Sequence, residues 1–303
     1  MLSADWPLDR PIDLLGTLRP LARGHGDRTI RLLRDEAWWT TRTSSGPATL
    51  RLRVGAGRLR AEAFGPGGTA LLERGRRLIG LDVPGAASTV IEPRHTIVRE
   101  LLRRYPGVRA SRTEAVLDAL VPAILEQKVT GGEARHVWHG LVRRCGEAAP
   151  GPPELGLRLA PSPAILAALP YHAYHPLGLE RRRAELIRSV ASRAAWFEAI
   201  AELPLAEAHR RLLSVPGIGP WTSAEVAVRA LGDADAVSVG DFHLPNLVSW
   251  LLAGEPRGDD ARMLALLEPY RGQRAIVMRL LELSGQRPPR YGPRLAPRRI
   301  AAI

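Results

Sequence analysis

Apolar and polar residues alternate in two segments near the N-terminus, residues 49–54 and 58–63, which are joined by Gly-Ala-Gly. A period of two residues with a glycine-containing turn is typical of a β-hairpin that exposes one face to solvent. Residues 36–43 can add a further strand, and the pattern of residues 68–79 predicts a helix that packs on the sheet. We therefore predict a small α+β domain with an antiparallel sheet over residues 1–83.

A helical period replaces this alternation from about residue 93 onward. Residues 111–114, Ser-Arg-Thr-Glu, have the spacing of a capping box, and apolar residues follow on one helical face. Pro122 lies inside that segment, so we expect a bend there or a later start of the helix. Further helices are predicted over residues 134–142, 178–199, 204–213, 220–231, 241–252, 259–267 and 270–283. Residues 84–284 should form a mostly helical domain.

Two segments lack either period. Residues 147–163 are rich in proline and glycine, which predicts a long surface loop. Residues 285–303 are rich in proline and arginine, and we expect a basic, loosely ordered tail there.

The net charge of the chain indicates what kind of partner it binds. Its 303 residues carry a formal net charge of +12, with a pI of about 11.1. Such a charge favours nucleic acid, although a basic proteome gives a similar bias. Cys145 is the only cysteine, which excludes an internal disulfide and a four-cysteine metal or iron–sulfur site. No apolar run is long enough to span a membrane and no signal segment opens the chain, so we expect a cytoplasmic protein without a membrane partner.

The segment Ser-Val-Pro-Gly-Ile-Gly-Pro-Trp, residues 214–221, joins two of the predicted helices. Gly217 and Gly219 allow backbone conformations closed to other residues, and Pro220 suits the first position of the next helix. The turn therefore presents backbone N–H groups at a helix N-terminus, which is a surface that binds phosphate. A tight helix–helix connection with no ligand is the alternative.

Asp241 follows this turn after about twenty residues, between a short apolar stretch and a new helix. An isolated aspartate in this position is more often an N-cap. The hairpin over 205–231 with this aspartate after it, however, resembles the helix-hairpin-helix (HhH-GPD) DNA glycosylase superfamily. Residues 123–127, Ala-Ile-Leu-Glu-Gln, and residues 269–271, Pro-Tyr-Arg, are similar to segments of its 3-methyladenine DNA glycosylase II (AlkA-type) branch. The resemblance covers nearly the whole chain.

The resemblance implies a base excision repair enzyme that flips an alkylated purine out of duplex DNA and hydrolyses its N-glycosidic bond. Asp241 matches the catalytic acid, and Trp221 matches a tryptophan of the base pocket, although it could be an ordinary core residue. Trp221 also stands where the bifunctional lyases of the superfamily carry a lysine. We therefore expect a monofunctional glycosylase without AP-lyase activity. We also expect the protein to be a monomer.

The resemblance also implies the residues that bind DNA: Gly217, Ile218, Gly219, Gln127, Lys128 and His243. Lys128, the only lysine, occupies the position of an apolar wedge residue and can act either as wedge or as phosphate contact. Backbone carbonyls of Leu213, Val215 and Ile218 match positions that hold a monovalent cation, Na⁺ or K⁺, as structural support. No cofactor is expected to be required for catalysis.

The sequence also allows other substrates and a function without catalysis. Residues 271–283 contain no aromatic side chain, although the AlkA-type branch has a pocket tryptophan in the matching segment. This difference allows oxidised or deaminated bases as substrates. A non-catalytic protein that uses the hairpin only to bind DNA is a further alternative. Residues 181–183, three consecutive arginines, are expected to form a solvated helix start, with contact to the DNA backbone as the alternative.

Overall fold

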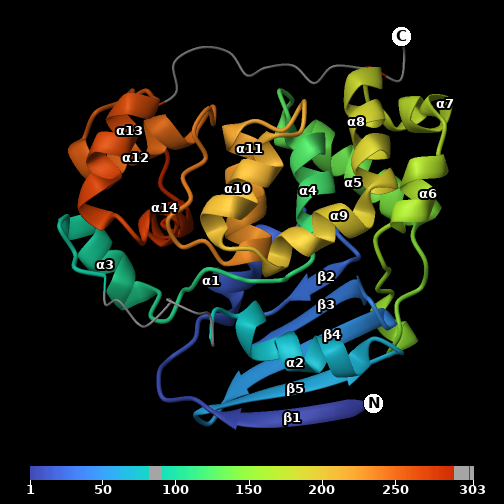
Figure 1. The fold of residues 1–303 in the computed structure, drawn as a ribbon. Coiled ribbons are helices and arrows are strands. Elements are labelled where there is room, and N and C mark those ends of the chain that lie inside the picture. The colour runs from blue at the N-terminus through green and yellow to red at the C-terminus, as the bar shows by residue number, and fades with distance from the viewer. Residues whose placement is uncertain (82–90, 290–299, 301–303) are drawn as a thin grey trace.

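The computed structural model describes residues 1–81, 91–289 and 300, and has an α+β fold with the sheet at its N-terminal end (Figure 1). Five antiparallel strands form this sheet in the order β1-β5-β4-β3-β2. The strands are β1 (Leu2–Pro7), β2 (Ile30–Leu32), β3 (Glu36–Thr43), β4 (Gly46–Gly55) and β5 (Arg58–Phe64). The predicted hairpin and the strand over 36–43 are confirmed, whereas β1 and β2 were not predicted.

The period of two places alternate side chains of β4 and β5 on the same side of the sheet. Leu50, Leu52 and Leu59 are buried there with Trp39, against α2 (Gly68–Leu78). The opposite face, which was expected to be exposed to solvent, carries an ordered contact. The Arg51 guanidinium lies there 4.9 Å from the centre of the Trp38 ring. The sheet therefore has a core of its own on one face.

The helical part is built around α4, whose side chains are buried along almost its whole length. Its helices are α3 (Thr96–Arg104), α4 (Val116–Glu126), α5 (Gly131–Cys145), α6 (Pro163–Ala168), α7 (Tyr171–Tyr174), α8 (Arg181–Ser192), α9 (Ala194–Glu198), α10 (Leu205–Leu213), α11 (Pro220–Val226), α12 (Leu244–Ala253), α13 (Asp260–Leu267) and α14 (Arg274–Leu283). A second apolar cluster joins α3 to α12, α13 and α14. In Figure 1 these four helices lie to one side of α10 and α11.

Most predicted helices are present, with differences in their bounds. The helix predicted over 134–142 extends over Gly131–Cys145, and the helix predicted over 270–283 begins only at Arg274. The helix predicted over 178–199 is divided into α8 and α9 at Arg193, whose φ and ψ are −113° and 30°. The helix predicted over 220–231 is α11 followed by a π-helical turn, η5 (Ala227–Leu231). The helix predicted over 241–252 begins only at Leu244, because Asp241 belongs to the turn before it.

The predicted capping box at residues 111–114 is wrong. Glu114 has a φ of +55°, and its carboxylate pairs with Arg77 at 2.8 Å and with Arg112 at 3.1 Å. The N-terminus of α4 is capped instead by Glu198, which accepts hydrogen bonds from the N–H groups of Val116 at 2.8 Å and Leu117 at 2.9 Å. The helix also runs through Pro122, so the predicted later start is wrong.

The remaining predictions concern segments outside the regular elements. Residues 147–163 include the short 3₁₀ turn η2 (Pro153–Leu155) and a bridge between Ala148 and Arg158. The predicted domain boundary at residues 83–84 and most of the predicted tail over 285–303 lie outside the described residues. Within residues 1–81 and 91–289, none of the helices has both the length and the apolar composition needed to cross a membrane.

Candidate active site

The turn between α10 and α11 has the backbone conformation that its glycines predict. Gly217 has a φ of +93°, and a Cβ atom there would lie 2.9 Å from a methyl group of Leu186. Gly219 is the N-cap of α11, and a Cβ atom there would have no neighbour within 4 Å. Pro220 occupies the first helical position. The backbone at Gly219 is therefore open to a ligand that approaches the N-terminus of α11.

Asp241 lies at the end of a tight turn that starts at Ser238. The Asp241 N–H donates to the Ser238 carbonyl at 3.2 Å, and Gly240, with a φ of +90°, occupies the third position of the turn. Asp241 Oδ1 accepts hydrogen bonds from the N–H groups of His243 at 2.7 Å and Leu244 at 2.9 Å. The carboxylate therefore caps α12, where the helix dipole stabilises its negative charge.

Trp221 joins the hairpin to this aspartate. Its indole Nε1–H, on the first turn of α11, donates to Asp241 Oδ2 at 3.0 Å. Because Oδ1 binds backbone amides and Oδ2 binds the indole, both carboxylate oxygens are held in place. Trp221 is half-buried. The two residues that the sequence placed in one site are thus in direct contact.

Phe242 was missed by the sequence analysis. Its side chain is 73% exposed, beside Asp241, and its ring packs edge-on against His243 with centroids 5.0 Å apart. An exposed phenylalanine next to a carboxylate offers an apolar surface to a ligand. The signal in the sequence was an aromatic residue between two polar ones at the start of a helix.

Gln127 lies against the hairpin. Its Nε2 donates to the Gly217 carbonyl and to Thr222 Oγ1, each at 3.0 Å. Lys128 follows with a φ of +53° and an exposed side chain. Glu126 Oε1 lies 3.8 Å from Arg23 Nη1. The turn that carries Lys128 is thus placed beside the hairpin by Gln127.

The prediction of a solvated helix start at residues 181–183 is wrong for one of the three arginines. Arg183 is only 3% exposed, and its Nη1 donates to the Leu125 carbonyl at 2.6 Å. This carbonyl belongs to the last turn of α4, where the helix itself offers no partner. Arg183 therefore supports the segment that leads to Gln127 and Lys128.

Of the three carbonyls suggested for a monovalent cation, that of Leu213 ends α10 and those of Val215 and Ile218 lie in the hairpin turn. The Val215 carbonyl accepts one hydrogen bond, from the Ile218 N–H at 3.0 Å, which leaves it a second lone pair. Neutral carbonyl oxygens are ligands suited to a singly charged ion. Among residues 1–81 and 91–289, no three His, Cys, Asp or Glu side chains lie close enough together to hold a metal ion.

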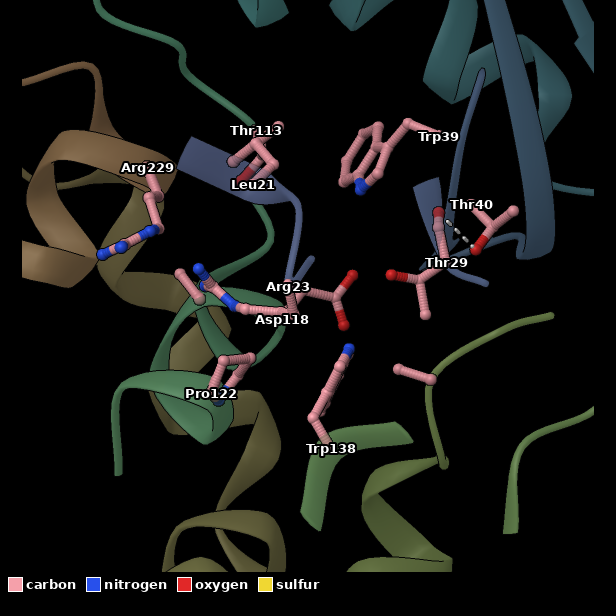
Figure 2. Close-up of a pocket in the computed structure, with 12 residues that line it drawn as sticks. Leu21, Arg23, Thr29, Trp39, Thr40, Thr113, Asp118, Pro122, Trp138 and Arg229 are labelled. Carbon is pink, nitrogen blue, oxygen red and sulfur yellow. Dashed lines mark hydrogen bonds between the residues drawn. The ribbon is translucent and has the colours of Figure 1, made fainter. Parts of the chain in front are cut away.

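A cavity of about 30 Å³ lies between the sheet and the helical part (Figure 2). Figure 2 shows Trp39, Thr29 and Thr40 on the sheet side and Arg229 on a helix at the other side. This volume accommodates one or two water molecules and is far too small for a nucleobase. Its polar lining, which includes Arg23, suits buried water, and we assign it no substrate.

Ser223, His209 and Asp233 are hydrogen-bonded in series. Ser223 Oγ lies 2.8 Å from His209 Nδ1, and His209 Nε2 lies 2.9 Å from Asp233 Oδ2. The order matches the triad of serine hydrolases, but Ser223 is only 1% exposed and cannot reach a substrate. The chain of bonds instead holds α10 against α11, and so fixes the hairpin.

The sequence is similar to a known DNA repair protein. Over 172 residues it is 30% identical to the probable bifunctional transcriptional activator/DNA repair enzyme AlkA of Mycobacterium tuberculosis, with 56% of this chain and 34% of that protein covered. The chain thus spans about a third of the length of the curated relatives it matches, at 34%. No protein-family model matches the chain.

Two of the following solved structures share the fold over nearly the whole chain, and the third shares it over 62% of the chain. The 3-methyladenine DNA glycosylase from Archaeoglobus fulgidus has a TM-score of 0.74 at 19% identity, with 93% of this chain and 98% of that chain covered. The 8-oxoguanine glycosylase/lyase from Clostridium acetobutylicum has a TM-score of 0.67 at 12% identity, with 93% and 96% covered. The Schizosaccharomyces pombe 3-methyladenine DNA glycosylase Mag1, solved with abasic DNA, has a TM-score of 0.51 at 17% identity, with 62% and 90% covered. The chain therefore shares the fold of solved DNA glycosylases, and over 56% of its length its sequence is similar to that of the probable repair enzyme AlkA.

Proposed function

We propose that the protein is a monofunctional DNA glycosylase of base excision repair that removes alkylated purines from duplex DNA. The contact of 3.0 Å between Trp221 Nε1 and Asp241 Oδ2 carries this proposal. It places an aromatic side chain and a fixed carboxylate next to the open N-terminus of α11. Those are the parts needed to clamp a DNA backbone, hold an extruded base and stabilise a cleaving sugar.

Electrostatic attraction between the basic protein and the phosphates of DNA would initiate binding. The net charge of +12 attracts the duplex. The backbone N–H groups of Gly217, which is exposed, and Gly219, which is half-buried, would donate hydrogen bonds to a phosphate. A monovalent cation on the carbonyls of Leu213, Val215 and Ile218 would hold the turn in shape and add positive charge next to that phosphate. Gln127 and Lys128 lie beside the same turn, where they can contact the strands around an extruded nucleotide, and His243 lies beside Asp241.

The chemical step needs a negative charge next to the sugar. Extrusion of a nucleotide costs a few kcal/mol and is easiest at a damaged pair. As the N-glycosidic bond breaks, positive charge develops on the sugar, and the Asp241 carboxylate stabilises it and orients the attacking water. Because backbone amides and the indole already hold the carboxylate, little reorganisation is needed when the charge appears. Trp221 and Phe242 offer faces for an electron-poor alkylated base.

The position of the only lysine supports the proposed absence of AP-lyase activity. A lyase forms a Schiff base between a lysine amine and the sugar. Trp221 occupies the matching position on α11, and the sole lysine, Lys128, lies in the turn after α4. The single lysine makes this part of the proposal easy to test, since a Schiff base through a side-chain amine can form only at Lys128.

The test is a panel of duplexes that each carry one lesion, including 3-methyladenine, 7-methylguanine, 8-oxoguanine and uracil, with an intact duplex beside them. We expect release of free methylated base, no strand scission, and no covalent adduct after borohydride reduction. Release of 8-oxoguanine or uracil alone would replace the proposed substrate, and base release with a borohydride-trapped adduct would replace the monofunctional assignment. Binding to every duplex without release from any would leave a DNA-binding protein only.

Asp241→Asn tests the residue that carries the mechanism. The asparagine keeps an oxygen for the backbone amides of α12 and loses the negative charge, so we expect base release to fall by about 10²–10³-fold with duplex affinity retained. Asp259→Asn is the matched control, because Asp259 caps α13 through the Arg262 N–H at 2.8 Å and lies outside the proposed site. A fully active Asp241→Asn variant would end the proposed mechanism.

A further inference from the structure

The helix α11 contacts the Asp241 turn at a second point besides Trp221. Glu225 stands four residues after Trp221, on the same face of the helix. Its Oε1 accepts a hydrogen bond from Ser238 Oγ at 2.6 Å. Ser238 is the residue whose carbonyl accepts the Asp241 N–H at 3.2 Å. One helix therefore holds the start of the turn through Glu225 and its end through Trp221.

The Glu225 carboxylate is itself fixed by charge. Burial alone would raise its pKa, but the Arg229 guanidinium and the Ser238 hydroxyl hold the pKa of this carboxyl below its usual value. Arg229 Nε also donates to the Pro20 carbonyl at 2.9 Å, and the same carbonyl accepts Arg23 Nη1 at 2.9 Å. The acceptor that Ser238 uses is thus ionised and tied to the N-terminal segment.

Burial of the Glu225–Arg229 ion pair carries a large desolvation penalty. Apolar side chains of similar volume often stabilise a buried site as well as an ion pair does, because desolvation offsets the attraction between the charges. Ser238, at 3% exposed, points its hydroxyl at this pair and makes no contact with solvent that would explain its polarity. What the pair and the serine do achieve is to fix the turn that ends at Asp241.

We propose that Glu225 and Ser238 are positioning residues, which set the distance of the Asp241 carboxylate from the phosphate-binding end of α11. The inference rests on the proposed glycosylase function. A displacement of about 1 Å in a reacting group can lower a rate by about a hundredfold. Asp260 supports the same turn from the other side, since its carboxylate accepts the Gly240 N–H at 3.0 and 3.1 Å. The loss of one support should therefore lower the rate only partly.

The test compares two buried serines. Ser238→Ala removes the hydroxyl that Glu225 accepts, whereas Ser249→Ala removes a buried hydroxyl on α12 for which the described residues provide no partner. With saturating enzyme on a duplex containing the excised lesion, we expect Ser238→Ala to slow base release about tenfold. Its affinity for a duplex with an abasic-site analogue should stay within about twofold, because the hairpin is unchanged. Ser249→Ala should match the wild type in both measurements, and Ser238→Thr, which keeps the hydroxyl, should restore the rate.

Amide hydrogen exchange over residues 238–244 provides a second measurement that needs no substrate. Faster exchange in Ser238→Ala than in Ser249→Ala is expected, because the turn loses one of its supports. Wild-type base release from Ser238→Ala would overturn the inference and leave the proposed function standing. If the wild type releases no base, the proposed function fails, and unchanged exchange in Ser238→Ala would then overturn the positioning role as well.

Discussion

Gly240 shows how a single backbone conformation supports the site. Its φ of +90° is strained for any residue with a side chain, although a Cβ atom there would meet nothing within 4 Å. Gly254, at the end of α12, has a φ of +72° and is equally open. The two glycines therefore carry the same kind of strain penalty, but only Gly240 lies next to Asp241.

We predict that Gly240→Ala and Gly254→Ala each lower the free energy of unfolding by about 1–2 kcal/mol, the cost of a left-handed residue with a Cβ atom. Base release should fall only in Gly240→Ala, since its peptide fixes the direction of the Asp241 side chain. Chemical denaturation and single-turnover base release measure the two effects. Equal activity in both variants would mean that the turn tolerates a change of shape.

At the scale of one element, the stability of α4 depends on a carboxylate from another helix. Burial, with the nearby Asp118 carboxylate, raises the pKa of Glu198 to about 7, although the amides of Val116 and Leu117 oppose the shift. The folded state then binds a proton more tightly than the unfolded chain, whose pKa is near 4.5. This contribution to stability is present in full below pH 4.5 and is lost as the pH rises through 7.

We therefore predict that the thermal midpoint of the wild type falls between pH 5.5 and pH 8 by more than that of Glu198→Gln. The glutamine keeps an oxygen for only one of the two amides, so the variant should be less stable than the wild type at low pH. Because the glutamine does not titrate, its thermal midpoint should change less with pH than that of the wild type. Glu154→Gln, at an exposed position on η2, is the control and should follow the wild type. Parallel curves for all three proteins would contradict the raised pKa of Glu198.

At the scale of the whole molecule, the positive charge should govern affinity for the duplex. The logarithm of the binding constant should fall linearly with the logarithm of the salt concentration, with a slope of about 0.9 for each phosphate neutralised. This relation separates the two roles open to Lys128. We predict that Lys128→Ala lowers the magnitude of the slope by about one if the ammonium contacts a phosphate, and leaves it unchanged if the stem is a wedge.

The control for this titration is Arg60→Ala. Arg60 lies on β5, which Figure 1 places at the end of the molecule away from α10 and α11, and it loses the same charge. An equal change of slope in both variants would show that net charge alone is responsible. A titration from 50 to 300 mM KCl, followed by fluorescence anisotropy, measures all three slopes.

The sequence predicted those features that depend on neighbours along the chain. The strand alternation and the glycines of the hairpin are local patterns with a direct physical meaning, whereas Asp241 was singled out by the resemblance to a known family. Features that depend on distant partners were missed or misread. Glu198 caps a helix whose first residues stand 82 positions away, and Arg183 binds a carbonyl 58 positions away. No local pattern marks such residues, because their role is set by packing.

The spacing of Trp221 and Glu225 on α11 has a mechanical consequence. In the proposed function the N-terminus of α11 binds a DNA phosphate, and one side of the same short helix contacts the turn that carries Asp241 at two points. The length of this helix would then fix the distance between the bound phosphate and the Asp241 carboxylate. The bond that is cut would therefore lie a constant number of nucleotides from that phosphate. A damaged base at the end of a strand, with no phosphate at that interval, should escape removal however well its ring would fit.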